Sequence, residues 1–515
     1  MVVDPDGGLR FQPRRPRRLK WPWQVAGILA IAALAWAVIG PLTPADDGKG
    51  AECAPGIHQT GPRKECIGVS DGSFVFEDSL KDVMSKIATE NGRVEKSGKK
   101  YVSVVYAEPL TTVPGEEEAK YGLRGELMGA YLAQRELNDP ELGAGRGDLP
   151  QIRLLVGNLG LRSEQWKELT DDLIDRSAGK DQVVAVAGFG QSRGGTRHAV
   201  DALREAGIPM MGATVTADGL ADAAHTGFFR VSAPNRDQAA GAVNYLKEQQ
   251  RKHPGYKVAV IRDRNTDDIY NTSLSTSFGT AAKAKGLRLE GAPLEYLSGV
   301  DGVTNAFSSV ADKVCDLAPD AVFFAGRGLN IRNFINSMSA PDRRCTVTLV
   351  TGDDALGAYY GTKESEQRRE KLRTEWRDSR VTVLYTALGH PALAGALYEK
   401  PNDPLPDFVD LYRAEFGGSD DAVAKALEDG QSILGHDAVW TLGVAVRNAA
   451  GPDGKGPVNP GATLQMLLQL GGSKAVSGLS GPIAFASDGN PDGKPMALVR
   501  MEPSGTYTFR QVLRP

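Results

Sequence analysis

From residue 101 onward, short runs of strand-forming residues alternate with helical stretches, and this alternation most constrains the fold. In the helix predicted at 166–176, for example, Trp166, Leu169 and Leu173 fall on one face. Parallel strands need crossover connections of this kind, so the alternation predicts a parallel sheet with helices on both faces. The strands are predicted at 102–107, 152–156, 183–188 and 208–212, and the helices at 121–138, 166–176 and 196–206.

A second alternation of the same kind follows residue 234, after a short strand at 228–231. Because 515 residues are too many for one hydrophobic core, we expect two doubly wound parallel-sheet α/β lobes. The last part is less regular, with two strands joined by a Gly/Asp turn. The strands here are predicted at 258–261, 289–296, 321–325, 347–351, 381–385, 482–485 and 496–501, and the helices at 274–285, 304–315, 435–450 and 464–470.

The N-terminal region predicts export. Residues 1–20 carry a net charge of +4, and residues 21–42 are uncharged and apolar except for Gln24. A helix of that length is about 33 Å long, enough to cross a bilayer, and its basic flank places residues 1–20 in the cytoplasm. We therefore predict a single-pass transmembrane helix at 21–42 and an extracytoplasmic body. The alternative is a signal peptide cleaved near Ala37 or Ala45, which would release a secreted protein.

The charge of the body excludes one class of partner. The whole chain has a net charge of −4, so the residues after 42 carry −8. Nucleic-acid binding needs a concentrated basic surface, which a mildly acidic body does not provide. We therefore predict no nucleic-acid partner.

The four cysteines fit an exported protein. Cys53 and Cys66 lie in a Gly/Pro-rich stretch with little core of its own, and Cys315 and Cys345 flank predicted strands. Four cysteines allow three connectivities, and we predict the two local disulfides. Zinc is the alternative, but the spacings do not suit it and only His58 lies near a pair. Residues 43–98 thus form a linker and a Cys-stapled loop, followed by an amphipathic helix that Asn91-Gly92 is expected to end.

Two loops at predicted strand ends offer ligand-binding groups. Residues 188–196 form a Gly-rich turn that opens a helix, where free backbone N–H groups favour an anion and Ser192 and Thr196 can add hydroxyl donors. Gln191 of the same turn is also a predicted ligand contact. Residues 212–218 follow the next strand and contribute Thr214 and Thr216. Plain Gly-rich and Thr-capped turns are the alternatives. Because α/β proteins bind ligands at the carboxyl ends of their strands, a shared pocket is favoured.

Two acidic segments suggest binding of a cationic group or a metal ion. Asp353 and Asp354 end a strand of the second alternation, where a carboxylate can balance an ammonium group; a solvated turn is the alternative. Residues 488–493 match the first half of a calcium loop. Val499 stands where that loop needs a bidentate Glu, so a hairpin turn is favoured over a metal site.

Enzyme signatures are missing from the sequence. The chain has no G-x-S-x-G elbow, no phosphate-binding G-x-x-x-x-G-K-[ST] loop and no H-E-x-x-H motif. The dinucleotide fingerprint fails in the 188–196 turn because Arg193 occupies the position of its third Gly. We predict no enzyme, no cofactor and no metal.

With these motifs in place, the chain from about 101 to the C-terminus resembles the type I periplasmic-binding proteins, in particular the branched-chain amino acid (Leu/Ile/Val) binding proteins of ABC importers. The order and spacing of several segments carry the resemblance. They are the Tyr-Ala-Glu-Pro-Leu-Thr opening at 106–111, the turn at 186–192, Gly-Ile-Pro and the Ala-Thr loop at 207–216, the crossover at 229–239, the strand at 258–261, Pro-Asp-Ala-Val-Phe-Phe-Ala-Gly at 319–326, Asp-Ala-Val at 437–439 and the closing hairpin at 481–489.

The resemblance implies a ligand held between the lobes. Ser192, Thr214 and Thr216 would hold a carboxylate from the first lobe, and Tyr270, Arg327 and Asp354 occupy the contact positions of the second lobe. Two departures bear on the ligand: Arg327 stands where an aromatic residue is frequent, and Gly157-Asn158-Leu159 replaces the usual acidic turn. Residues 43–98 and the transmembrane tether have no counterpart in the family core.

The resemblance also implies an architecture and a function. We expect lobe 1 at 99–233 plus 388–494 and lobe 2 at 234–387 plus 495–515, joined by a multi-strand hinge. The predicted function is capture of a small polar, amino-acid-like solute for an ABC importer, with permease subunits as partners. The alternative is a ligand-sensing ectodomain of the same fold that signals to a partner protein. An enzyme on a dinucleotide-binding fold is disfavoured by the broken Gly fingerprint.

Overall fold

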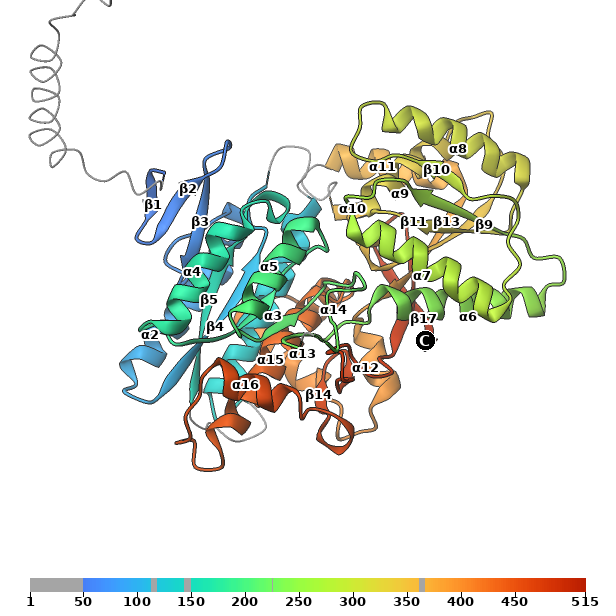
Figure 1. Ribbon diagram of the computed structural model, residues 1–515. Coiled ribbons are helices and arrows are strands. Elements are labelled where there is room, and N and C mark those ends of the chain that lie inside the picture. The colour runs from blue at the N-terminus through green and yellow to red at the C-terminus, as the bar shows by residue number, and fades with distance from the viewer. Residues whose placement is uncertain (1–49, 113–117, 143–149, 225, 361–365) are drawn as a thin grey trace, which may run out of the picture. The chain divides into compact units, whose positions relative to one another are not determined.

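The computed structural model describes residues 50–112, 118–142, 150–224, 226–360 and 366–515. Residues 51–515 form one compact unit built on two large sheets (Figure 1). The segment predicted to cross the membrane, 21–42, lies outside the described residues. None of the helices within the described ranges combines the length and the apolar character that a membrane span requires.

The first sheet has eight strands in the order β1-β2-β3-β5-β4-β6-β7-β8. Strands β4 to β8 are parallel, as the alternation predicted, and β3 adds to β5 in the antiparallel direction. The sheet is therefore mixed. Its strands are β1 (Glu52–Ala54), β2 (Ile57–Thr60), β3 (Glu65–Ser70), β4 (Tyr101–Glu108), β5 (Gln151–Asn158), β6 (Val183–Gly188), β7 (Met210–Gly212) and β8 (Phe228–Arg230).

Side chains of β4 alternate between two buried faces, which explains why the strand is apolar throughout. Val104 and Tyr106 pack in the core that includes α2 and α3, whereas Val105 packs in the core beneath α4 and α5. The helices of this half are α2 (Lys81–Lys96), α3 (Glu118–Asn138), α4 (Trp166–Ala178), α5 (Gly194–Glu205), α12 (Pro391–Leu397), α13 (Leu405–Phe416), α14 (Asp420–Leu427), α15 (Gln431–Ala450) and α16 (Pro460–Leu467).

The segment expected to be a Cys-stapled loop is instead three strands of the first sheet. β3 pairs with β5 over Gly68–Asn158 to Ser70–Val156, and the predicted Cys53–Cys66 disulfide joins β1 to β3 with its Cα atoms 6.1 Å apart. The strands are short and their apolar positions few, so the sequence pattern did not reveal them. The segment acquires its core by extending an existing sheet.

The expectation that α2 ends at Asn91-Gly92 is also wrong, because α2 continues to Lys96. Asn91 is buried, and its side chain pairs with the backbone of β5: Nδ2 donates to Leu154 O at 2.7 Å, and Leu154 N donates to Oδ1 at 3.0 Å. An amide that can satisfy both groups of a buried peptide unit is used here to dock a helix, not to stop one.

The second sheet has seven strands in the order β10-β9-β11-β12-β13-β16-β17. Strands β9 to β13 are parallel, and β16 and β17 are antiparallel additions. Figure 1 shows α6 and α7 side by side along one face, with α8 and α9 on the other. The strands are β9 (Val258–Asp263), β10 (Leu294–Tyr296), β11 (Ala321–Ala325), β12 (Val347–Thr351), β13 (Val381–Ala387), β16 (Met496–Met501) and β17 (Tyr507–Leu513).

Alternation along β11 again separates two cores. Phe323 stacks on Phe278 of α7 with ring centroids 3.6 Å apart, whereas Phe324 packs against Phe334 of α9. Both rings are buried, so the strand reads as a continuous apolar run. The helices of this half are α6 (Asn235–Lys252), α7 (Ile269–Lys285), α8 (Val303–Leu317), α9 (Gly328–Met338), α10 (Gly357–Tyr360) and α11 (Glu366–Ser379).

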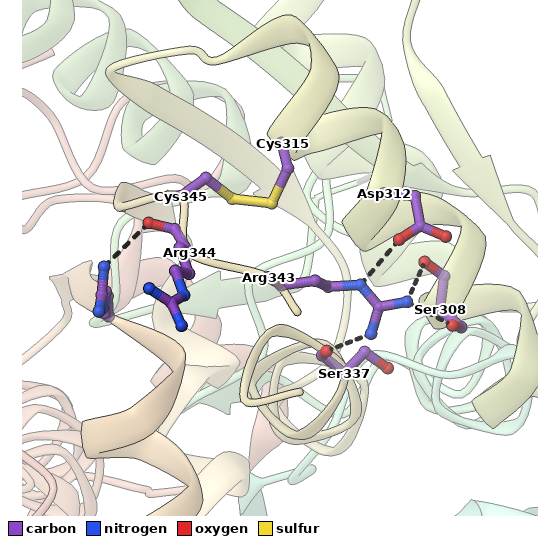
Figure 2. Close-up of a disulfide and its surroundings, with 8 residues drawn as sticks. Ser308, Asp312, Cys315, Ser337, Arg343, Arg344 and Cys345 are labelled. Carbon is purple, nitrogen blue, oxygen red and sulfur yellow. Dashed lines mark hydrogen bonds and ion pairs between the residues drawn. A yellow bond between two sulfur atoms is a disulfide. The ribbon is translucent and has the colours of Figure 1, made fainter. Parts of the chain in front are cut away.

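The second predicted disulfide, Cys315–Cys345, joins the end of α8 to the segment before β12, with Cα atoms 5.3 Å apart. Figure 2 shows Arg343 beside it, bound to both neighbouring helices. Its guanidinium donates to Asp312 at 2.8 Å and Ser308 Oγ at 2.7 Å on α8, and to Ser337 O at 2.7 Å on α9. All four cysteines are thus in disulfides, which removes the zinc alternative.

The C-terminal part departs from expectation in its pairing. The strands predicted at 482–485 and 496–501 do not pair with each other: β15 (Gly481–Ile483) pairs with β14 (Val476–Gly478), and β16 pairs with β13 and β17. The strand predicted at 289–296 is reduced to β10. Between β15 and β16 the chain passes from the first sheet's helices to the second sheet, as it also does after β8 and, in the reverse direction, after β13.

Helices α3 and α15 cross at very short distance because glycines face each other. A Cβ atom on Gly129 of α3 would collide with the carbonyl oxygen of Ser432, and one on Gly435 of α15 would collide with the carbonyl oxygen of Glu126. Both obstacles are backbone and cannot move aside. The crossing also sets the position of the α3 residues that face the ligand-binding region.

Candidate ligand-binding site

The seven residues predicted to bind a ligand all line one cavity of about 410 Å³. Four lie in the loops after β6 and β7 of the first sheet, one lies on α7, and two follow β11 and β12 of the second sheet. The cavity therefore lies where the carboxyl ends of both sheets' strands meet, which is where α/β proteins commonly place a ligand. The seven are Gln191, Ser192, Thr214, Thr216, Tyr270, Arg327 and Asp354.

The turn after β6 has an unusual backbone. Gly188, Phe189 and Gly190 all have positive φ, at 94°, 76° and 55°. Glycine adopts such angles freely, but Phe189 pays about 1–2 kcal/mol for a left-handed conformation. A Cβ atom on Gly190 would collide with the carboxylate of Glu108. The glycines are therefore needed both for the turn and for the close approach of Glu108.

Ser192 organises the loop after β7. Its side chain is buried, and Oγ accepts hydrogen bonds from Thr216 N at 3.1 Å and Ala217 N at 3.0 Å. The backbone N–H groups of Thr216 and Ala217 are thus already bound within the protein and are not available to an anion. Because a hydroxyl has one O–H donor as well as two acceptor sites, Ser192 keeps its donor for a further partner.

The second-sheet side of the cavity holds an ionic cluster centred on Asp268. Arg327 donates from Nε and Nη2 to the two oxygens of Asp268, each at 2.9 Å, and from Nη1 to Asp354 Oδ2 at 3.2 Å. Its guanidinium lies 4.5 Å from the ring centre of Tyr270. Asp354, which the sequence suggested for a ligand ammonium, is therefore paired with Arg327.

Two arginine contacts join the two sides of the cavity. Arg193, after β6, donates from Nη1 to Asp268 Oδ2 at 2.8 Å, and Arg327 Nη2 donates to Ser192 O at 2.8 Å. Burial opposes the ionisation of Asp268, but Arg327 and then Arg193 outweigh it and hold the pKa of Asp268 at about 2. Burial, followed by the nearby Arg327, lowers the pKa of Arg193 to about 10. Both groups stay charged at neutral pH.

A chain of hydrogen bonds connects the cavity to the crossover strands. Thr216 Oγ1 donates to Asp353 Oδ1 at 3.2 Å, and Gln238 Nε2 donates to the same oxygen at 2.8 Å. Gln238 Oε1 in turn accepts from Asp353 N at 3.0 Å and from Thr386 Oγ1 at 2.6 Å on β13. Burial raises the pKa of Asp353 to about 6, although the Gln238 hydrogen bond opposes the shift.

Sequence reasoning missed Asp268, Arg193 and the carboxylates Glu108 and Glu126. Asp268 is the N-cap of α7 and accepts from Tyr270 N at 3.1 Å, so the sequence signal of an ordinary helix cap hides its second role. In the sequence, Arg193 stands out only as a departure from the dinucleotide fingerprint. Glu126 falls on the same helix face as Leu123 and Leu127, a signal of burial that was available.

The calcium alternative at 488–493 finds no support. Asp488 Oδ1 accepts from Asn490 N at 2.9 Å, and Asp488 Oδ2 accepts from Arg236 Nη2 at 3.1 Å, which makes the segment a tight turn. Within the described ranges, no three or more His, Cys, Asp or Glu side chains are grouped in a way that could hold a metal ion. A second cavity, of about 550 Å³, lies between α15, α16 and residues 474–477 and contains none of the seven predicted residues.

Two sheets with a polar cavity at their strand ends define a two-lobed α/β binding protein. The sequence profile of the family described as periplasmic binding protein matches residues 119–506. The chain belongs to this family. Membership in a family of binding proteins agrees with the prediction that the chain is not an enzyme. A comparison with curated protein sequences found no significant match.

Solved structures share the fold at low sequence identity. The isoleucine complex of LivJ, the branched-chain amino acid transporter substrate-binding protein of Streptococcus pneumoniae, is 20% identical with a TM-score of 0.56, covering 81% of this chain and 100% of its own. A leucine complex of an ABC transporter substrate-binding protein from Desulfitobacterium hafniense is 19% identical with a TM-score of 0.56, covering 80% and 100%. The leucine-binding protein LivK of Thermotoga maritima is 18% identical with a TM-score of 0.55, covering 80% and 99%.

Proposed function

We propose that the protein captures a small, polar, amino-acid-like solute in this cavity and delivers it to the permease of an ABC importer. The observation that carries the proposal is the convergence of seven predicted residues, drawn from both sheets, on one cavity of about 410 Å³. That volume suits a small metabolite. The fold neighbours that hold leucine or isoleucine support the same class of solute.

Within the cavity, the free O–H of Ser192 is proposed to hold the solute carboxylate, together with the hydroxyls of Thr214 and Thr216, which exchange their acceptors Glu126 and Asp353 for the carboxylate when the solute binds. Asp354 is proposed to face the ammonium group, with its position fixed by Arg327. Gln191, Tyr270 and Arg327 form the remaining wall. A solute that bridges both sides favours the closed state only by the difference between its affinities for the closed and open states.

The proposal includes the cellular location and the lobes. We propose that 21–42 anchors the chain in the cell membrane and that the body is extracytoplasmic, which the two disulfides and the family support. Lobe 1 is proposed to span 99–233 plus 388–494, and lobe 2 to span 234–387 plus 495–515.

A thermal-unfolding screen of the full-length protein in mild detergent tests the function. Amino acids, short amides, small peptides and sugars are added singly, and a solute at 100 times its Kd should add about 2.7 kcal/mol of stability. Thr216→Val should lower the affinity for the hit about tenfold, because it removes one hydroxyl without changing shape. Thr280→Val, at an exposed position of α7, is the matched control. Ser192→Ala is avoided because it would also strand two buried amides.

A screen in which no solute stabilises the protein would contradict the proposal. That result would favour the alternative, a sensory ectodomain of the same fold whose ligand is a peptide or protein partner.

A further inference from the structure

Two carboxylates lie together at the first-sheet wall of the cleft. Glu126 of α3 lines the cavity, and Glu108, at the end of β4, lies behind the Gly188–Gly190 turn that forms part of the same wall. Both are buried: Glu126 is 3% exposed and Glu108 0%. The absence of side chains at Gly188 and Gly190 makes the space for the Glu108 carboxylate, which a larger residue at either position would fill.

The hydrogen bonds of the pair are unequal. Glu126 Oε2 accepts from Tyr106 OH at 2.9 Å, and Oε1 accepts from Thr214 Oγ1 at 3.1 Å. Glu108 makes no well-aligned hydrogen bond among the described residues, and the polar groups nearest to it are the backbone N–H of Gly190 and the carboxyl group of Glu126. A fully buried carboxylate that is so weakly satisfied is costly, so a further donor would stabilise the pair.

No ion pair among the described residues includes Glu108 or Glu126. Of the three arginines that line the cavity, the half-buried Arg193 and the buried Arg327 are bound to Asp268, and Arg162 is exposed. The groups that face Glu126 are Tyr106, Glu108, Thr214 and Asp429. This end of the cleft therefore has an excess of negative groups, whereas the Asp268 cluster is balanced internally.

We propose that Glu126, supported by Glu108, binds a protonated amino group of the solute, so that the captured solute is a cationic amine such as a basic amino acid or a small diamine. The inference rests on the proposed function and names its substrate class. An ammonium group carries three donors. Glu126, which lines the cavity, offers it acceptor lone pairs, and Glu108 adds its negative charge from behind the cavity wall. Arg193 and Arg327 remain committed to Asp268, so the solute completes the charge balance of the cleft.

Without a solute, the two carboxyl groups bind a proton, which lowers the free-energy cost of burying them. Burial and then Glu126 raise the pKa of Glu108 well above its ordinary value, and burial raises the pKa of Glu126 to about 7 although Tyr106 and Thr214 oppose the shift. An arriving ammonium group favours the ionised carboxylates, so binding should release a proton near pH 7.

Isothermal titration of the full-length protein with L-lysine, putrescine and L-norleucine tests the inference. Norleucine has the shape of lysine without the side-chain ammonium group. We expect lysine or putrescine to bind at least about 30-fold more tightly than norleucine, the scale set by leaving a buried charge unpaired. Titrations in phosphate and Tris buffers should reveal proton release at pH 7 with the cationic solutes only.

Variants locate the effect. Glu126→Gln keeps an acceptor for Tyr106 and should lower the affinity for the cationic solute about 30-fold while abolishing proton release. Glu108→Gln should act in the same direction, and it serves alone if Glu126→Gln lowers the unfolding midpoint. Glu168→Gln, the same charge change at an exposed position of α4, should leave binding unaltered.

The outcomes separate the two proposals. If norleucine or another neutral solute binds as tightly as lysine, or if both glutamine variants keep the affinity for lysine, the inference is overturned while solute capture stands. If no solute binds the wild-type protein, the proposed function fails and the inference fails with it.

Discussion

At the scale of single residues, Asp268 is the centre of the ion pairs in the cleft, because it binds both Arg193 and Arg327. Its folded pKa of about 2 lies below the ordinary 3.8, so the ionised group stabilises the fold above pH 4 and loses that contribution as the pH falls toward 2. Asp268→Asn should lower the free energy of unfolding by about 2.5 kcal/mol at pH 7 and by about half that at pH 3. Denaturant titrations at the two pH values measure the difference.

If the free energies of unfolding of wild type and Asp268→Asn differ by the same amount at pH 3 and pH 7, this account is contradicted. Asp267→Asn is the matched control, since Asp267 is the exposed neighbour and its side chain is outside the arginine cluster.

Residue identity alone anticipated part of the site. Ser192, Thr214 and Thr216 were predicted because hydroxyls stand in loops at successive strand ends, and the structure brings them to one cavity. Arg193, Asp268 and Glu108 were missed because their roles depend on partners distant in sequence: Asp268 lies 75 residues from Arg193 and 59 from Arg327. A local pattern contains no signal for such pairing.

At the scale of elements, the crossing of α3 and α15 tolerates no added side chain. Gly435→Ala should lower the free energy of unfolding by about 3 kcal/mol or more, because its Cβ atom meets backbone and the two helices must separate. Gly92→Ala is the matched control within α2, where nothing lies within 4 Å of the added atom. That change should stabilise the protein by about 0.5–1 kcal/mol. Equal effects of the two substitutions in denaturant unfolding would contradict the prediction.

The two disulfides should differ in how much each contributes to the free energy of unfolding. Cys315 and Cys345 close a loop of 30 residues, and Cys53 and Cys66 close one of 13. Chain entropy predicts that Cys315→Ala with Cys345→Ala costs about 3.6 kcal/mol, against about 2.9 kcal/mol for the other pair. Chemical unfolding of the two double variants compares them. A larger loss from the Cys53–Cys66 variant would show that docking of β3 on β5, not loop closure, dominates there.

Sequence patterns predicted the long elements well and the short edge strands poorly. The strands at 321–325 and 347–351 coincide with β11 and β12, because nearly all of their residues are buried and the runs consist of apolar and β-branched residues. Strands β1 to β3 and β17 were missed, and 289–296 was too long. β1, β10 and β17 are edge strands with a neighbour on one side only, and β2 and β3 are short strands that join the sheet through antiparallel pairing outside the β–α alternation, so none of these strands has the long apolar run that marks a central parallel strand.

At the scale of the whole molecule, the contacts between the two sides of the cavity should bias opening. Arg193→Met removes the ion pair with Asp268 while Arg327 still neutralises that carboxylate. We expect about a tenfold shift from the closed toward the open state without solute, seen as a larger radius of gyration in small-angle X-ray scattering. Arg262→Met, which breaks an exposed pair with Glu295 within the second sheet, should not change the radius. An unchanged radius in Arg193→Met would show that other contacts hold the two sides together.

The global architecture was accessible because two successive strand–helix alternations leave few topologies. The alternation could not predict which strand of the parallel sheet each antiparallel strand pairs with. β16 joins β13 across more than a hundred residues, and β3 joins β5 from outside the region that the family profile matches. Such pairings are decided by which edge is free in the assembled sheet, a property that exists only after folding.

The hydrogen bonds of Gln238 bear on the rates of solute binding and release. Its side-chain amide donates to Asp353 and accepts from Thr386, so rotating the amide by 180° would place its oxygen against the Asp353 carboxylate. A solute that draws Asp353 toward itself pulls on a group whose other end is fastened to β13, where the chain crosses between sheets. Arrival and departure of a solute pass through the same rearrangement of that amide in opposite directions. Because affinity differences within one site lie mostly in the dissociation rate, a substitution of Gln238 is expected to change how long a solute stays more than how fast it binds.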